Sequence, residues 1–327
     1  MGLGLECIEI IIIWLYSILY YNEIKCIWKF FFKIIKRTSV TMGIEIANIY
    51  NDILRQMYIV LIALNTFFIT VVGFDHVICY LEVEDFDLFL WITFNYPRIV
   101  TLNFMMIYVY SLKIIRRQFY FINKSISCLP EVYADKNNIS AEINKIKLNP
   151  RETDKRLKDL NQLDLDLRDS IKMLNKLLSL PLTLAFLMQL SQLIVNIYLV
   201  LVFFSKKNYR NWRETSSTLT NIGWLLMRLF QLLCTVNICD SICHEGNSKA
   251  KIMHELWVSK RPDGSKEMLK SISLHQLREP IEIKLYDSLN MNHELLYKLS
   301  GVVTTYLIIM IQLDEQSKSI KHHHSNV

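Results

Sequence analysis

Apolar runs of about twenty residues recur along this chain, with polar and charged segments between them. A helix rises about 1.5 Å per residue, so a run of that length crosses a hydrocarbon core about 30 Å thick. We therefore expect an all-α, polytopic helical membrane protein. Its six predicted spans lie near Leu3–Tyr20, Met57–Tyr80, Leu88–Leu112, Leu178–Phe204, Leu219–Cys239 and Leu295–Leu313.

The last run carries one distinct face. At about 100° per residue, five positions, most of them polar or without a side chain, fall within an arc of about 80°: Lys298, Gly301, Thr305, Ile308 and Gln312. A polar amide in hydrocarbon is costly unless it meets a polar partner or water. The stripe predicts either a close seam with another helix or the wall of a water-filled path, and the residues alone leave both open.

A second pattern precedes the fourth run. Apolar residues recur there at spacings of three and four, at Leu160, Leu163, Leu167, Ile171, Leu174 and Leu178. This heptad-like stripe predicts a helix that projects into the cytosol and packs its leucines on a neighbour, with the charged Asp164, Asp166 and Arg168 in water. The preceding span can continue as that neighbour, through Ile115, Phe119, Ile122 and Ile126, which gives a helical hairpin within one subunit.

Composition and charge agree with a membrane protein and set its orientation. Hydrophobic residues make up 52% of the 327 residues, and mean hydropathy is +0.22. Six Lys and Arg lie in 21–56, fourteen in 113–177 and eight in 240–294, against none, four and two in the alternate segments 81–87, 205–218 and 314–327. The rich segments are expected to be cytoplasmic and the C-terminus extracellular. Because the net charge of +6 gathers in these loops, nucleic acid is not an expected partner.

Polar and aromatic residues also lie in the outer halves of the predicted spans. Such groups are costly in a membrane and converge in small-molecule pockets. The candidate ligand-binding residues are Asp75, His76, Trp91, Asn95, Arg98, Gln192, Asn196, Trp224 and Arg228. The alternative is that they join helix to helix, with Asp75 paired to Arg98.

Enzymatic and metal-dependent functions find no support in the residues. The chain has no HExxH, GxSxG, P-loop or GxGxxG motif, and its seven cysteines form no CxxC pair. We expect no catalytic residue, no metal site and no cofactor.

The segment Thr305-Tyr306-Leu307-Ile308-Ile309-Met310-Ile311-Gln312-Leu313 resembles the terminal signature of insect gustatory receptors: Thr-Tyr, five hydrophobic residues, Gln and Phe. Leu313 stands where the family usually has Phe. The run from His275 to Ile281 resembles the short helix that these receptors carry before their last span, although the glycine often found beyond it is absent, with Asp287 and Ser288 in that region.

This resemblance implies seven spans in an orientation inverted relative to rhodopsin-like receptors. With six predicted spans, the chain looks like a receptor that lacks the first one. The implied organisation is a bundle over 1–294 with a ligand pocket in its outer half and cytoplasmic anchor helices at about 113–177 and 240–294. Residues 295–313 would line the pore, and 314–327 would form a short extracellular tail.

The implied function is a ligand-gated, non-selective cation channel of the cell membrane, opened by a small-molecule tastant. Four subunits, identical or with other gustatory receptors, would assemble in lipid around one pore. Gln312 and Leu313 would form its narrowest point, with Thr305 and Ile308 on the same helix. A partner-dependent or non-conducting subunit and an unrelated transporter are the alternatives.

Overall fold

The computed structural model describes residues 21–42, 46–82, 88–127, 150–205, 212–258, 263–286 and 288–325. These residues are almost entirely helical, which confirms the predicted fold class. The elements are α2 (Tyr21–Met42), α3 (Ile46–Glu82), α4 (Leu88–Ser127), α6 (Pro150–Ser205), α7 (Trp212–Val258), α8 (Asp263–Arg278), β1 (Lys284–Leu285), β2 (Leu289–Asn290) and α9 (His293–Ser325).

Within the described residues, five helices are long and apolar enough to cross a membrane. The segments are Asn51–Val77, Arg98–Ser127, Asp154–Ser205, Glu214–Val258 and His293–Gln316. They correspond to five of the six expected spans, and the chain is a multi-pass membrane protein. The other expected span, Leu3–Tyr20, lies outside the described residues, as does most of the loop between α4 and α6.

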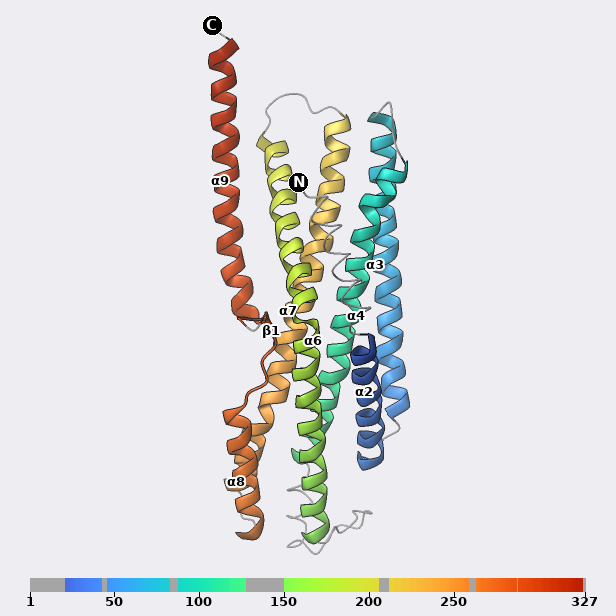
Figure 1. Cartoon of the computed structure of the whole chain (residues 1–327), viewed down its shortest axis with the longest axis vertical. Coiled ribbons are helices and arrows are strands. Elements are labelled where there is room, and N and C mark those ends of the chain that lie inside the picture. The colour runs from blue at the N-terminus through green and yellow to red at the C-terminus, as the bar shows by residue number, and fades with distance from the viewer. Residues whose placement is uncertain are drawn as a thin grey trace, which may run out of the picture.

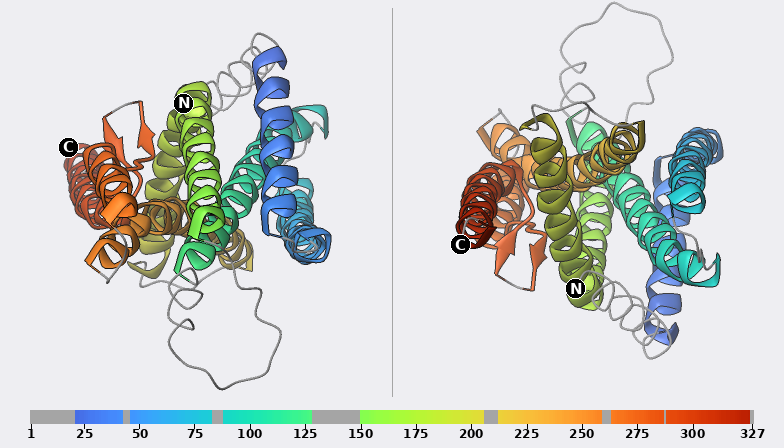
Figure 2. Two further views of the ribbon diagram at one scale, coloured as in Figure 1. Left: turned by 90° about the horizontal axis from the view of Figure 1, so that it is seen from below. Right: turned by 90° about the horizontal axis from the view of Figure 1, so that it is seen from above.

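The long helices α3, α4, α6 and α7 run side by side along the long axis of the molecule (Figure 1). At the lower end of this view, α8 lies beside α7, and α2 lies beside α6. The end views in Figure 2 place α9 at one side of the bundle and α3 at the other. The terminal helix is therefore a peripheral element of the single chain.

The main core lies where α4, α6 and α7 pack together. Ile115, Phe119, Ile122 and Ile126 of α4 are fully buried, and they share one apolar cluster with the leucine stripe of α6, namely Leu157, Leu160, Leu163, Leu167 and Ile171. Burying a leucine or isoleucine stabilises a fold by about 1.5–3 kcal/mol, so this seam is a strong one. The predicted helical hairpin within one subunit is confirmed.

Two charged residues of the leucine helix do not face water, contrary to the expectation. The side chains of Asp164 and Arg168 are 0% and 6% exposed, whereas Asp166 reaches the surface and its carboxylate lies 3.4 Å from Arg37 of α2. A heptad stripe shows which face of a helix is apolar, but it does not show how many neighbours surround the helix. Because α6 packs against α2, α4 and α7, its flanks are covered too.

A small antiparallel hairpin, β1–β2, connects α8 to α9. Lys284 pairs with Asn290, and Leu285 pairs with Leu289. The turn between them places Tyr286 at a φ of 45°. This left-handed conformation favours glycine, which the chain lacks here.

Tyr286→Gly is therefore expected to leave the thermal midpoint of the purified protein nearly unchanged. Relief of about 1 kcal/mol of backbone strain offsets the larger conformational entropy of glycine in the unfolded chain. Tyr286→Val, with a β-branched side chain at the same position, should lower the midpoint by several degrees. Fluorescence-detected size exclusion after heating compares the thermal midpoints of the three proteins. If the midpoint of the glycine variant falls as far as that of the valine variant, the backbone at Tyr286 is not strained.

Candidate functional site

Among the described residues, the terminal helix α9 is the least covered of the five apolar helices. Only 11% of its most apolar window is buried inside the chain, against 50% for α7. Its base is held firmly, because Met291 and Leu295 are buried in the main core and His293 Nε2 lies 3.4 Å from the Asp240 carboxylate of α7. Above the base the helix rises beside the bundle (Figure 1).

The predicted pore residues lie on this uncovered part. Thr305, Ile308, Gln312 and Leu313 are all exposed, and the space beside Gly301 is open. The Thr305 hydroxyl donates a hydrogen bond to the Gly301 carbonyl at 2.9 Å, so the helix satisfies it internally. Among the described residues the stripe therefore has no helix–helix seam.

Lys298, the one cation on the stripe, is paired at the base of the helix. Its ammonium lies 2.8 Å from the carboxylate of Glu294, one turn earlier, and both side chains are exposed. The charge thus points toward the start of α9, away from the positions near Gln312.

Three of the predicted ligand-binding residues meet at the junction of α4 and α7. The Arg98 guanidinium donates a hydrogen bond to Asn95 Oδ1 at 3.4 Å, and its Cζ lies 4.8 Å from the centre of the Trp224 ring. Trp224 packs edge-on against Phe68 of α3, with ring centres 5.5 Å apart. Asn95 and Trp224 are buried. A cation, an aromatic face and an amide from separate positions are the groups that orient a small polar aromatic ligand.

The other candidates lie on α3, α4, α6 and α7. Asp75 and His76 are half-buried on α3, where His76 stacks on Tyr80. Gln192 and Asn196 are half-buried on α6, and Arg228 is buried on α7. The side chain of Trp91 lies outside the described residues. The Asp75–Arg98 pair stays a prediction.

Two polar pairs inside the apolar helices escaped the sequence analysis. The amides of Asn65 and Asn103 exchange hydrogen bonds of 3.1 and 3.2 Å between α3 and α4. Gln189 of α6 donates to Gln231 of α7 at 3.4 Å. Each residue is a lone amide in an apolar run, which is the signal that marks an interhelical contact, but its partner cannot be chosen from one sequence.

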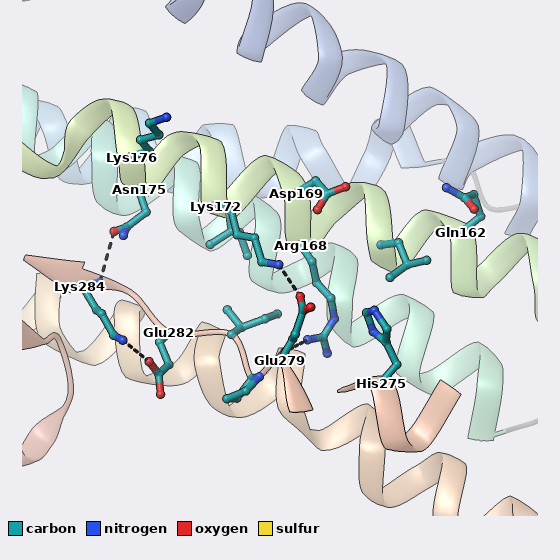
Figure 3. A pocket seen from close by; sticks show the side chains of 14 residues that line it. Gln162, Arg168, Asp169, Lys172, Asn175, Lys176, His275, Glu279, Glu282 and Lys284 are labelled. Atoms are coloured by element: carbon teal, nitrogen blue, oxygen red, sulfur yellow. Dashed lines mark hydrogen bonds and ion pairs between the residues drawn. The ribbon is translucent and has the colours of Figure 1, made fainter. Parts of the chain in front are cut away.

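A cavity of about 610 Å³ lies between α6 and the segment that follows α8 (Figure 3). Basic and acidic side chains both line the cavity. They include two exposed ion pairs, Lys172 with Glu279 at 2.7 Å and Lys284 with Glu282 at 2.6 Å. The hydrogen bond from Lys172 lowers the pKa of Glu279. Sequence reasoning missed this cavity because its two walls lie about a hundred residues apart.

Known proteins share this sequence pattern and this fold. Residues 3–317 match the family described as 7tm Chemosensory receptor. The structure of the insect olfactory receptor OR5 from Machilis hrabei is similar at a TM-score of 0.67 and 10% identity, covering 96% of this chain and 80% of that one. The same receptor in complex with eugenol gives a TM-score of 0.64 at 10% identity, covering 94% and 78%. A search of curated proteins returned no match. At this identity the structural similarity shows the fold alone.

Proposed function

Because this chain belongs to the 7tm chemosensory receptor family, we propose that it is a gustatory receptor, a ligand-gated, non-selective cation channel opened by a small-molecule tastant. The family comprises receptors, not enzymes, in line with the lack of catalytic motifs. The terminal motif resembles that of insect gustatory receptors, which agrees with the family and supports a role in taste.

The observation that carries the channel proposal is the exposed stripe of α9. The described residues leave Thr305, Ile308 and Gln312 uncovered on a helix apolar enough to cross a membrane, where lipid is a poor environment for an amide. Four copies of α9 around one axis would bring these residues to a water-filled path and cover the flanking isoleucines. Gln312 would offer amide oxygens to a passing cation without fixing its identity, and Leu313 would close a dry constriction.

The proposed organisation follows from that arrangement. Residues 1–294 form the bundle with the ligand site and the cytoplasmic anchor, 295–313 line the pore, and 314–327 end outside the cell. The excess of Lys and Arg in 113–177 and 240–294 supports this orientation. A tetramer, of this chain alone or with other gustatory receptors, is the proposed assembly.

For the ligand site we propose the junction of Asn95, Arg98 and Trp224, with the remaining outer-half candidates around it. OR5 of the same fold has been solved in complex with eugenol, a small aromatic molecule, which supports small-molecule binding by this chain. Trp224 belongs to a small apolar core of α3, α4 and α7 that includes Phe68, Leu102 and Met227, and this core supports the junction.

Whole-cell current in cells expressing this chain, recorded against a panel of sugars, amino acids and bitter compounds, tests the function. The expected result is a cation current evoked by at least one compound, absent from untransfected cells. A chain that reaches the cell surface and gives no current, alone or co-expressed with other gustatory receptors, would refute the channel.

Trp224→Phe is expected to raise the half-maximal concentration of the active compound about tenfold, with little change in maximal current. The smaller ring keeps the packing on Phe68 but holds the Arg98 guanidinium less well. Tyr96→Phe, at an exposed aromatic position on α4, is the matched control and should leave the concentration–response curve in place. Equal shifts in the two variants would exclude the junction as the ligand site.

A further inference from the structure

A buried ionic cluster joins three helices, α6, α7 and α8. Asp164 Oδ2 of α6 accepts hydrogen bonds from Arg168 Nε, from Lys249 Nζ of α7 and from Gln276 Nε2 of α8, each at 3.0 Å. All four residues are buried. One carboxylate therefore orients two cations, and both must find further acceptors inside the protein.

Arg168 finds its acceptors on the backbone. One terminal nitrogen of its guanidinium donates to the Gly246 carbonyl of α7 at 2.6 Å, and the other donates to the Glu279 carbonyl at 3.2 Å. Figure 3 shows the side chain reaching from α6 toward Glu279. The guanidinium thus ties α6, α7 and the start of the segment 279–292 together. We call this segment the linker, because it connects α8 to α9.

Further side chains hold the linker along its first half. The amide of Asn247 donates to the Ile281 carbonyl at 3.1 Å and accepts from the Ile281 N–H at 2.8 Å. Asn175 accepts from the Lys284 N–H at 3.3 Å. A Cβ on Gly246 would lie 2.4 Å from Cδ1 of Ile281, so the linker rests directly on α7. Side chains of α6 and α7 therefore hydrogen-bond to the backbone of the linker, as a neighbouring strand does in a sheet.

The linker determines where α9 begins. Met291 N–H donates to the Ile283 carbonyl at 2.9 Å, so the held half of the linker positions the residue just before the helix. Gln312 lies about 28 Å from His293 along the helix, and a tilt of about 5° at the base would move it by about 2.5 Å. Beyond Leu296 and Leu299, which pack on the main core, few of the described residues cover α9, so this displacement meets few contacts among them.

We propose that Arg168 is a positioning residue for channel opening. Its guanidinium, oriented by Asp164, fixes the linker and thereby sets the direction of α9. This inference rests on the proposed channel function, because it assigns α9 to the pore. The geometry requires arginine: its planar fork reaches Asp164, Gly246 and Glu279 at once, whereas the single ammonium of lysine keeps the charge and cannot span both carbonyls.

Arg168→Lys is the test variant, and Lys172→Met is its matched control. Lys172 lies one turn along α6 and contacts the Glu279 side chain at the surface, not the linker backbone. In hydrogen–deuterium exchange of the purified proteins, Arg168→Lys should speed exchange of peptides covering 279–285 about tenfold or more. The control should match wild type.

A second readout reports the base of α9 without any current. Cysteines are introduced together as Asp240→Cys and His293→Cys. In the wild-type protein these two side chains meet, with His293 Nε2 3.4 Å from Asp240 Oδ2. Their oxidative closure should be several-fold slower when Arg168→Lys is added, and unchanged when Lys172→Met is added. In whole-cell recording, Arg168→Lys should change the ligand-free current several-fold relative to the maximal current.

Unchanged exchange or unchanged disulfide closure in Arg168→Lys would overturn the proposal, because the linker would then be held by other groups. Altered exchange with a wild-type ratio of ligand-free to maximal current would also overturn it. If the wild-type chain carries no current under any condition, the proposed channel function fails instead, and the exchange and disulfide results alone decide whether Arg168 positions α9.

Discussion

Asp164→Leu is expected to destabilise the folded protein by about 3–5 kcal/mol, a large stability loss for a single substitution. Removing one partner of a buried ion pair leaves the other charge uncompensated. Here two cations, Arg168 and Lys249, lose their shared carboxylate, and Gln276 loses its acceptor. Thermal melting of the solubilised protein, followed by fluorescence-detected size exclusion, should show little or no folded material at 37 °C.

Two other variants separate this effect from general damage to the helix. Asp169→Leu changes an exposed carboxylate on the same helix and should melt close to wild type. Lys249→Met should also be mild, because Asp164 keeps Arg168 as its counter-ion and Gln276 as a donor, so that no buried charge is left uncompensated. Equal losses for Asp164→Leu and Asp169→Leu would show that the cluster does not hold the helices together.

Gln312→Arg is expected to reduce the cation current about 100-fold. In a fourfold pore, four guanidinium groups about 5 Å from the axis would each raise the energy of a monovalent cation by about 0.8 kcal/mol in water, or about 3 kcal/mol together. Each 1.4 kcal/mol corresponds to a factor of about ten. Whole-cell current normalised to surface-labelled protein measures the effect.

Gln312→Glu is the control of opposite sign. Its side chain has nearly the same shape as glutamine, and a ring of negative charge should maintain or raise the cation current and favour divalent ions. A loss of current in both variants would indicate that bulk or folding at this position matters more than charge. Wild-type current in both would place the pore away from α9.

The apolar periodicity of the sequence was sufficient for the helical framework. The leucine stripe of α6 and its partner residues on α4 were predicted correctly. A long helical repeat of apolar residues leaves water only by packing against a neighbouring helix. The terminal motif was also enough to indicate the family that the comparison found.

The same periodicity misplaced Asp164 and Arg168. The helix also carries the exposed Asp169, and no local signal distinguishes the buried carboxylate of Asp164 from the exposed one. Only the approach of Lys249 and Gln276, from helices 85 and 112 residues away in the sequence, makes burial favourable for Asp164. Contacts between helices therefore determine which charged side chains are buried and which stay exposed.

The outer-half polar residues show the same division. That Asn95, Arg98 and Trp224 lie in apolar spans is a property of the sequence, and it marked them as candidates. That Arg98 lies over the ring of Trp224 depends on the rotations of α4 and α7 against one another. A single sequence does not encode these rotations in any short pattern.

The sequence by itself determined the helices, their apolar faces, the family motif and the polar stripe on the last span, because each depends on residues that are neighbours along one helix. The tertiary structure decided that the stripe of α9 is uncovered within its own chain and that Arg168 holds the linker at its base. Both depend on contacts between residues far apart in sequence, whose free energies arise only once the helices have packed.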